Sequence, residues 1–116
     1  MDNVFDWGKV IDEYPLSFKF FKETVFPNTP IVNRSILSLY HIRSLYYFFD
    51  SIGIILSVEC FNESQWVGHI QLRSGFSFSI KGYHSSRSEL ENSAFIDCFE
   101  QLEVRLNNLK NKNKKI

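Results

Sequence analysis

The sequence is poor in the residues that hold disulfide-rich or metal-dependent proteins together. It has two cysteines, Cys60 and Cys98, and three widely spaced histidines. A disulfide framework needs more cysteines, and a metal site needs more ligands at closer spacing. The two cysteines fall on a predicted strand and a predicted helix at inward positions, so we expect two buried thiols. A disulfide between them would require an exported chain.

Long apolar runs and a net charge are also missing. No run approaches the roughly 18 residues of a membrane span, and the start, MDNVFDWGKV, has neither the basic residues nor the apolar core of a signal peptide. We therefore expect a cytoplasmic protein. Thirteen basic side chains balance thirteen acidic ones, but four lysines follow residue 109, which leaves residues 1–109 with a net charge of −4. An acidic body binds polyanions poorly.

These charges suggest a division of the chain. We expect one domain over residues 1–109 and a flexible basic tail over residues 110–116. The tail either keeps the chain in solution or attracts nucleic acid weakly.

No catalytic signature is present. The sequence has no glycine-rich phosphate loop and no G-x-S-x-G, H-E-x-x-H or C-x-x-C motif. His41, His69 and His84 are scattered, and Asp50 and Glu91, assigned to helix surfaces, are not brought together by any pattern. We expect neither an enzyme nor a cofactor, and no small-molecule substrate is indicated.

What the sequence does have is twelve phenylalanines, which predict an aromatic core. Trp7 and Trp66 are interpreted as core or edge anchors. If Phe5, Trp7 and some of the tyrosines at 40, 46 and 47 are uncovered, they would instead form an aromatic patch typical of a partner or dimer interface.

The first half of the chain predicts helices. A helical segment from Phe5 breaks near Pro15, and a longer helix ends at PNTP, residues 27–30. We interpret residues 31–41 as a loop packed on the core. A short helix then ends at Gly53, a residue suited to a left-handed cap. Its apolar face contains Ile42, Leu45, Tyr46, Phe49 and Ile52.

From Gly53 the apolar period changes to two, which predicts three antiparallel strands with short connections. The inner face is predicted to contain Ile54, Leu56, Val58 and Cys60, then Trp66, Gly68, Ile70 and Leu72, then Phe76, Phe78 and Ile80. The outer face is predicted to contain Ser57, Glu59, His69, Gln71, Arg73, Ser77, Ser79 and Lys81.

The last third predicts a long helix that covers this sheet. Ser86 and Glu89 have the spacing of a capping box, so the helix should begin near Arg87. At 100° per residue, one arc contains Ala94, Phe95, Cys98, Phe99, Leu102, Leu106 and Leu109. The residues outside this arc are Glu89, Ser93, Asp97, Glu100 and Glu103. The fold class is therefore α+β, with N-terminal helices, a three-stranded antiparallel meander and a C-terminal helix.

This α-β-β-β-α order is that of double-stranded-RNA-binding domains. Such domains grip phosphates through several lysines at the start of the last helix. Here that stretch supplies Arg87 alone, beside Glu89 and Glu91. Two carboxylates in the first turn repel phosphate, so we do not favour RNA binding.

The best candidate for a binding face lies on the outer side of the sheet, at His69, Gln71, Arg73 and Lys81. The alternative interpretation is that these side chains are polar because they face water.

Three stretches resemble a family of small uncharacterised proteins from phages and mobile elements of Bacteroidetes. They are DWGKVIDEYP at 6–15, LYYFFDSIGI at 45–54 and SRSELENSAFIDCFEQLE at 86–103, about a third of the chain. The resemblance implies an accessory protein of unknown function and supplies no site residues. Leu90 departs from the smaller alanine expected there, which we interpret as a change in the outer packing of the helix.

Together these patterns favour a small non-enzymatic accessory protein that acts by binding another protein or a second copy of itself. The alternative is a nucleic-acid-binding module that uses the open sheet face and the lysine tail.

Overall fold

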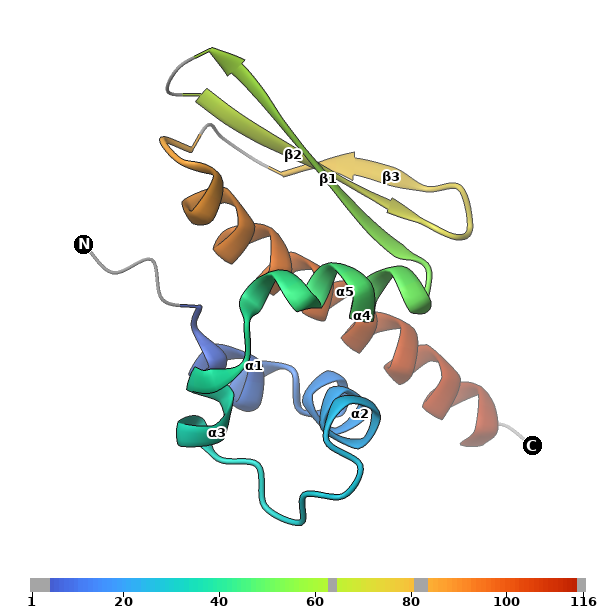
Figure 1. Ribbon diagram of the computed structural model, residues 1–116. Coiled ribbons are helices and arrows are strands. Elements are labelled where there is room, and N and C mark those ends of the chain that lie inside the picture. The colour runs from blue at the N-terminus through green and yellow to red at the C-terminus, as the bar shows by residue number, and fades with distance from the viewer. Residues whose placement is uncertain (1–4, 63–64, 81–83, 115–116) are drawn as a thin grey trace.

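The fold is α+β, in the order predicted from the sequence (Figure 1). A computed structural model describes residues 5–62, 65–80 and 84–114. Its helices are α1 (Trp7–Glu13), α2 (Pro15–Val25), α3 (Arg34–Leu39), a 3-10 turn η1 (Ile42–Ser44), α4 (Leu45–Ser51) and α5 (Arg87–Lys114). Its strands are β1 (Ile54–Asn62), β2 (Gln65–Leu72) and β3 (Ser77–Ser79).

The predicted break between the first two helices is confirmed at Tyr14 and Pro15. Residues 31–41, however, are not simply a loop. Asn33 accepts a 3.0 Å hydrogen bond from the backbone N–H of Ile36 and so caps α3, whose Leu37 is buried. The prediction missed α3 because a six-residue helix with a single buried side chain has almost no apolar period.

The predicted short helix before Gly53 is confirmed as η1 and α4. Leu45 and Phe49 are buried as expected, and Phe48 is buried beside them. Gly53 has φ +79°, the left-handed conformation that ends such a helix without a side-chain penalty. A Cβ at position 53 would lie 2.7 Å from Nε of Arg73, so the site has no room for a side chain either.

The strands form one antiparallel sheet in the order β1-β2-β3, which confirms the meander. Leu56 lies opposite Ile70, and Ile70 lies opposite Phe78. Helices α4 and α5 cover one face of this sheet, and the other face is left open by the described helices (Figure 1). The alternation predicted from the sequence is correct over the middle of the sheet, where Ile54, Leu56 and Ile70 are buried.

The predicted inner face is wrong at two ends of the sheet. Cys60 is exposed and Phe76 is 62% exposed, whereas Cys98 is buried as predicted. Cys60 lies where the register of β1 and β2 shifts, and Phe76 precedes the three-residue strand β3. Alternation assigns the side of a sheet, but a side chain is buried only where a helix lies opposite.

The core lies between α5, the sheet and the N-terminal helices, and it is aromatic as predicted. The ring of Phe99 lies 4.9 Å from that of Phe49, 5.8 Å from that of Phe21 and 5.8 Å from that of Trp7, measured between centroids. Phe5 and Trp7 are buried at 7% and 8% exposure. The alternative of an open patch built on Phe5 and Trp7 is therefore wrong.

Helix α5 begins at Arg87 as predicted, and the Oγ of Ser86 accepts a 3.1 Å hydrogen bond from the N–H of Glu89. Its predicted inner arc is buried from Ala94 to Leu102, but Leu109 is 53% exposed. Leu90 does not belong to the outer packing. It is fully buried, and its Cδ1 lies 3.4 Å from the place where a Cβ of Gly68 would be.

Two glutamates predicted on the outer surface of α5 are buried instead. Glu103 accepts hydrogen bonds from the N–H groups of Ser17 at 2.7 Å and Leu16 at 3.4 Å. It thereby caps the N-terminus of α2, where Tyr14 offers no side-chain cap. Glu91 is 1% exposed and joins α5 to the segment before it, as described below.

Helix α5 continues past residue 109 to Lys114, so the lysines at 110, 112 and 114 are part of the helix. The division into a domain over 1–109 and a flexible tail over 110–116 stays a prediction.

Candidate functional site

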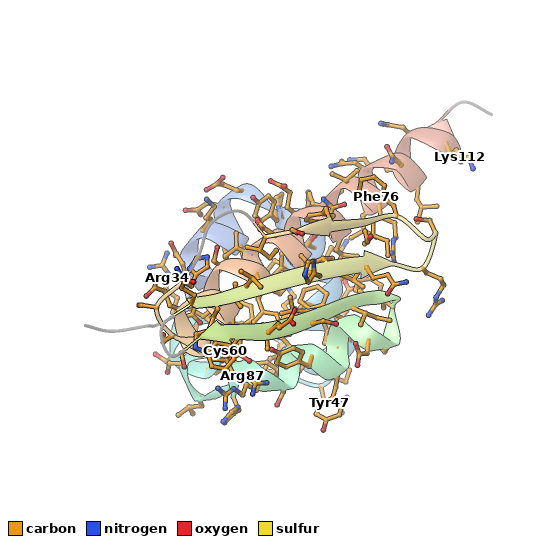
Figure 2. The ribbon with its side chains drawn as sticks, turned by 90° about the horizontal axis from the view of Figure 1, so that it is seen from above. Arg34, Tyr47, Cys60, Phe76, Arg87 and Lys112 are labelled. Atoms are coloured by element: carbon orange, nitrogen blue, oxygen red, sulfur yellow. The ribbon has the colours of Figure 1, made fainter. Side chains whose placement is uncertain are left out.

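The predicted binding face is only partly assembled. His69 and Gln71 are exposed on the open face of the sheet, onto which Figure 2 looks. The Nδ1 of His69 lies 3.0 Å from the Oγ of Ser79 on β3. Across the β1–β2 pair, Ser57 lies opposite His69 and Ile55 lies opposite Gln71.

Arg73 does not lie with His69 and Gln71 on this face. Arg73 follows Leu72, the last residue of β2, and its side chain lies against Gly53 and faces a groove beside α5. Lys81 lies outside the described residues. Of the predicted residues that the structure describes, His69 and Gln71 share the open sheet face, and Arg73 faces the groove.

This groove has a volume of about 650 Å³. One wall is the turn after β2 together with the end of α4, and the other wall is the C-terminal third of α5. The lining residues are Ile52, Leu72, Arg73, Ser74, Gln101, Val104, Arg105, Asn108, Leu109 and Lys112.

The groove exists because α5 is longer than the sheet that it covers. Its 28 residues span about 42 Å, whereas the eight residues of β2 span about 26 Å. Helix α5 packs against β1 and β2, and its Leu90, Ala94 and Cys98 are fully buried. The same stripe continues one and two turns later as Gln101 and Arg105, where the helix leaves the sheet and runs on past it (Figure 1).

Apolar side chains line much of the groove. Ile52 and Leu72 are half-buried at its inner end. Val104 and Leu109 are 51% and 53% exposed, and both lie on α5, the longest of the helices in the described ranges. Such side chains on a rigid element, next to a hollow, are typical of contact surfaces.

The charged groups of the groove all have one sign. They are Arg73, Arg105 and Lys112, and none of the described residues that line the groove is acidic. Arg105 is held in place, because its Nη1 donates a 2.6 Å hydrogen bond to the backbone oxygen of Ile52 at the end of α4. A cation at a helix C-terminus is favourable, and the guanidinium keeps donors for a further ligand.

A second hollow, of about 380 Å³, lies between β3 and α5 and has the opposite charge. It is lined by Asp97 and Glu100, together with Phe78, Ile80 and two serines. Burial, with a smaller contribution from Glu100, raises the pKa of Asp97 above its usual value. The two hollows beside α5 therefore carry opposite charges, although the chain as a whole has no net charge.

Glu91 is the centre of a polar cluster whose geometry is that of a structural joint. It accepts hydrogen bonds from the hydroxyl of Tyr46 at 2.6 Å, the Nε of Arg43 at 3.0 Å and the Nε of Arg87 at 3.2 Å. Burial, and then the bond to Glu91, raises the pKa of Tyr46 to about 12. The cluster fastens η1 and α4 to the first turns of α5.

The described residues contain no group of three or more histidine, cysteine or acidic side chains that could hold a metal ion. Among the helices of the described ranges, none combines the length and the apolar character needed to cross a membrane.

Sequence reasoning missed Val104, Arg105 and Lys112 as parts of a surface. A signal was present, because the stripe of α5 that faces the sheet changes from Leu90, Ala94 and Cys98 to polar residues from Gln101 onward. That change marks where a helix outlasts its sheet. Only the structure shows that Arg73 and Ile52 meet it there.

Comparisons with protein families, curated proteins and solved structures find no match to this chain.

Proposed function

We propose that this chain is a cytoplasmic, non-enzymatic accessory protein of the phage or mobile-element type, which acts by binding another protein. The binding surface is the groove between the C-terminal third of α5 and the turn after β2. The observation that carries the proposal is the exposure of Val104 and Leu109 on a rigid helix beside a hollow of about 650 Å³.

Two further features support this surface. Phe76, 62% exposed in the β2–β3 turn, lies at the same end of the molecule as the last turns of α5 (Figure 2). A contact surface that combines an aromatic ring, aliphatic side chains and arginine has the composition of protein interfaces. The open sheet face carries Glu59, His69, Gln71 and several serines together with Ile55, which is 44% exposed, and none of the cavities described above lies on it.

The test is retention of a partner by matched variants. Purified chain is immobilised and exposed to an extract of its natural host, and retained proteins are identified by mass spectrometry. Leu109→Asp should abolish retention of the partner, because it places a charge among the apolar contacts. Leu39→Asp is the matched control, since Leu39 is 86% exposed on α3. Equal retention by both variants, with both folded by circular dichroism, would remove the groove as the binding surface.

Nucleic-acid binding is the second candidate, because Arg73, Arg105 and Lys112 line one groove without an acidic neighbour in its lining. Phosphate contacts release counterions, so binding should be strongest at low salt. A mobility-shift assay at two salt concentrations with RNA and DNA tests it. No retardation at low salt removes this candidate and leaves the protein-binding proposal standing.

A further inference from the structure

We infer that the groove takes an acidic amphipathic helix from the partner, one that presents aliphatic residues along one side and carboxylates beside them. This inference deepens the proposed function and rests on it. It names the chemistry of the partner, which the proposal above leaves open.

The positions of the cations favour a helical occupant. Arg105 and Lys112 are seven residues apart on α5, which places them two turns and about 10.5 Å apart along one side of the helix. Arg73 stands on the opposite wall. A helix laid along α5 between these walls would bring carboxylates seven residues apart against Arg105 and Lys112.

The apolar part of the groove sets the second requirement. Val104 and Leu109 line the groove from α5 and are about half exposed, so each offers apolar surface to an occupant. Ile52 and Leu72 close the inner end. The hollow can hold aliphatic side chains that a phosphate backbone does not supply.

Charge complementarity favours the basic groove over the acidic hollow as the binding surface for an acidic helix. The hollow lined by Asp97 and Glu100 would repel it, whereas the basic groove has three cations and no acid among its described lining residues. The body of the chain carries a net charge of −4, so a basic groove on it also orients an acidic partner during approach.

The experiment measures binding by fluorescence anisotropy with three labelled helical peptides of about twenty residues, a length that spans the exposed third of α5. The first has leucines on one side and flanking glutamates. The second replaces every glutamate with lysine, and the third replaces every leucine with serine. The acidic leucine peptide should bind at least about tenfold more tightly than either of the other two, because it alone satisfies both requirements.

Charge-reversal variants locate the site. Arg73→Glu and Lys112→Glu together should weaken the acidic peptide at least about tenfold and should strengthen binding of the lysine peptide, a swap that unfolding cannot produce. Lys19→Glu, at an exposed position on α2, is the matched control and should leave both affinities unchanged. Arg105 is left intact because its bond to Ile52 holds the end of α4.

Three results would overturn the inference. The first is equal binding of the acidic and lysine peptides, and the second is equal binding of the acidic peptide with and without leucines, which indicates a site for any polyanion. The third is a dimer by light scattering that Leu109→Asp dissolves, which would make a second copy the occupant. If host-partner retention depends on Leu109 but the acidic peptide fails to bind, the inference is wrong and the proposed function stands.

Discussion

The hydroxyl of Tyr46 donates a 2.6 Å hydrogen bond to the carboxylate of Glu91, across 45 positions of sequence. Arg43 and Arg87 donate to the same carboxylate, so a 1% exposed anion is fully supplied with donors. This joint fixes the start of α5 against α4. The rest of α5, including the end that overhangs the sheet, takes its direction from that start.

Replacing Glu91 with glutamine should destabilise the protein by about 1–3 kcal/mol, because it removes the charge from three hydrogen bonds while leaving a buried polar group. Both arginines are about half exposed and can turn to water, which keeps the loss below that of a fully buried pair. Urea denaturation measures the free energy of unfolding. Glu23→Gln, on the exposed side of α2, is the control and should change it by less than about 0.5 kcal/mol.

The same joint predicts a loss of stability at high pH. The pKa of Tyr46 is raised to about 12, so the unfolded chain, whose tyrosines have a pKa near 10, releases this proton first. The contribution is fully present below about pH 10 and is lost as the pH rises toward about 12. In Tyr46→Phe the free energy of unfolding should fall less steeply with rising pH in this window. Parallel curves for Tyr46→Phe and the unaltered protein would contradict the assignment.

Phe99 should be among the costliest side chains to remove. Its ring contacts five other aromatic rings, and it is fully buried. Phe99→Ala should cost about 3–5 kcal/mol in thermal or urea unfolding, and Phe99→Asp should unfold the chain. Phe76→Ala makes the same substitution at a position that is 62% exposed, and it should cost less than about 1 kcal/mol. Similar losses for both alanine variants would mean that α5 is not docked as described.

Two glycines separate backbone strain from crowding. Gly53 and Gly75 both have positive φ, at +79° and +96°, but a Cβ at 53 would meet Arg73 at 2.7 Å, whereas a Cβ at 75 meets nothing within 4 Å. Alanine should therefore be more destabilising at 53 than at 75, where strain of about 1 kcal/mol acts alone. Differential scanning calorimetry measures both. An equal fall in melting temperature would show that Arg73 moves aside freely.

The element types other than α3 could be predicted because each of those elements has a local signal. The period of two after Gly53 and the arc from Ala94 to Leu102 both depend on neighbours within a few residues, and the structure confirms them. The helix boundaries at Pro15 and Gly53 are also set by the local residue itself.

The errors came from partners that lie far away in the sequence. Glu91 and Glu103 are charged and were therefore assigned to the surface, but their donors come from Tyr46 and from the N–H of Ser17. Cys60 and Phe76 fit the alternation of the sequence and are nevertheless exposed, because periodicity does not say where the strand or the helix cover stops.

The candidate site was the least predictable part for the same reason. His69 and Gln71 are exposed as expected, but Arg73 faces the groove with Val104 and Arg105. Alternation placed Arg73 on the open sheet face, and only the end of β2 at Leu72 releases it from that pattern. The groove lies where α5 extends beyond the sheet, so its position depends on the relative lengths of the helix and the strands, which no local pattern gives.

The most direct test of the groove as the binding surface is a titration of the isotope-labelled chain with the acidic leucine peptide, followed by amide chemical shifts. This account predicts shifts concentrated at 72–74 and 101–112, with the amide signals of the open sheet face unchanged. Shifts concentrated at Ser57, His69 and Gln71, with 101–112 unchanged, would place binding on the sheet and contradict it.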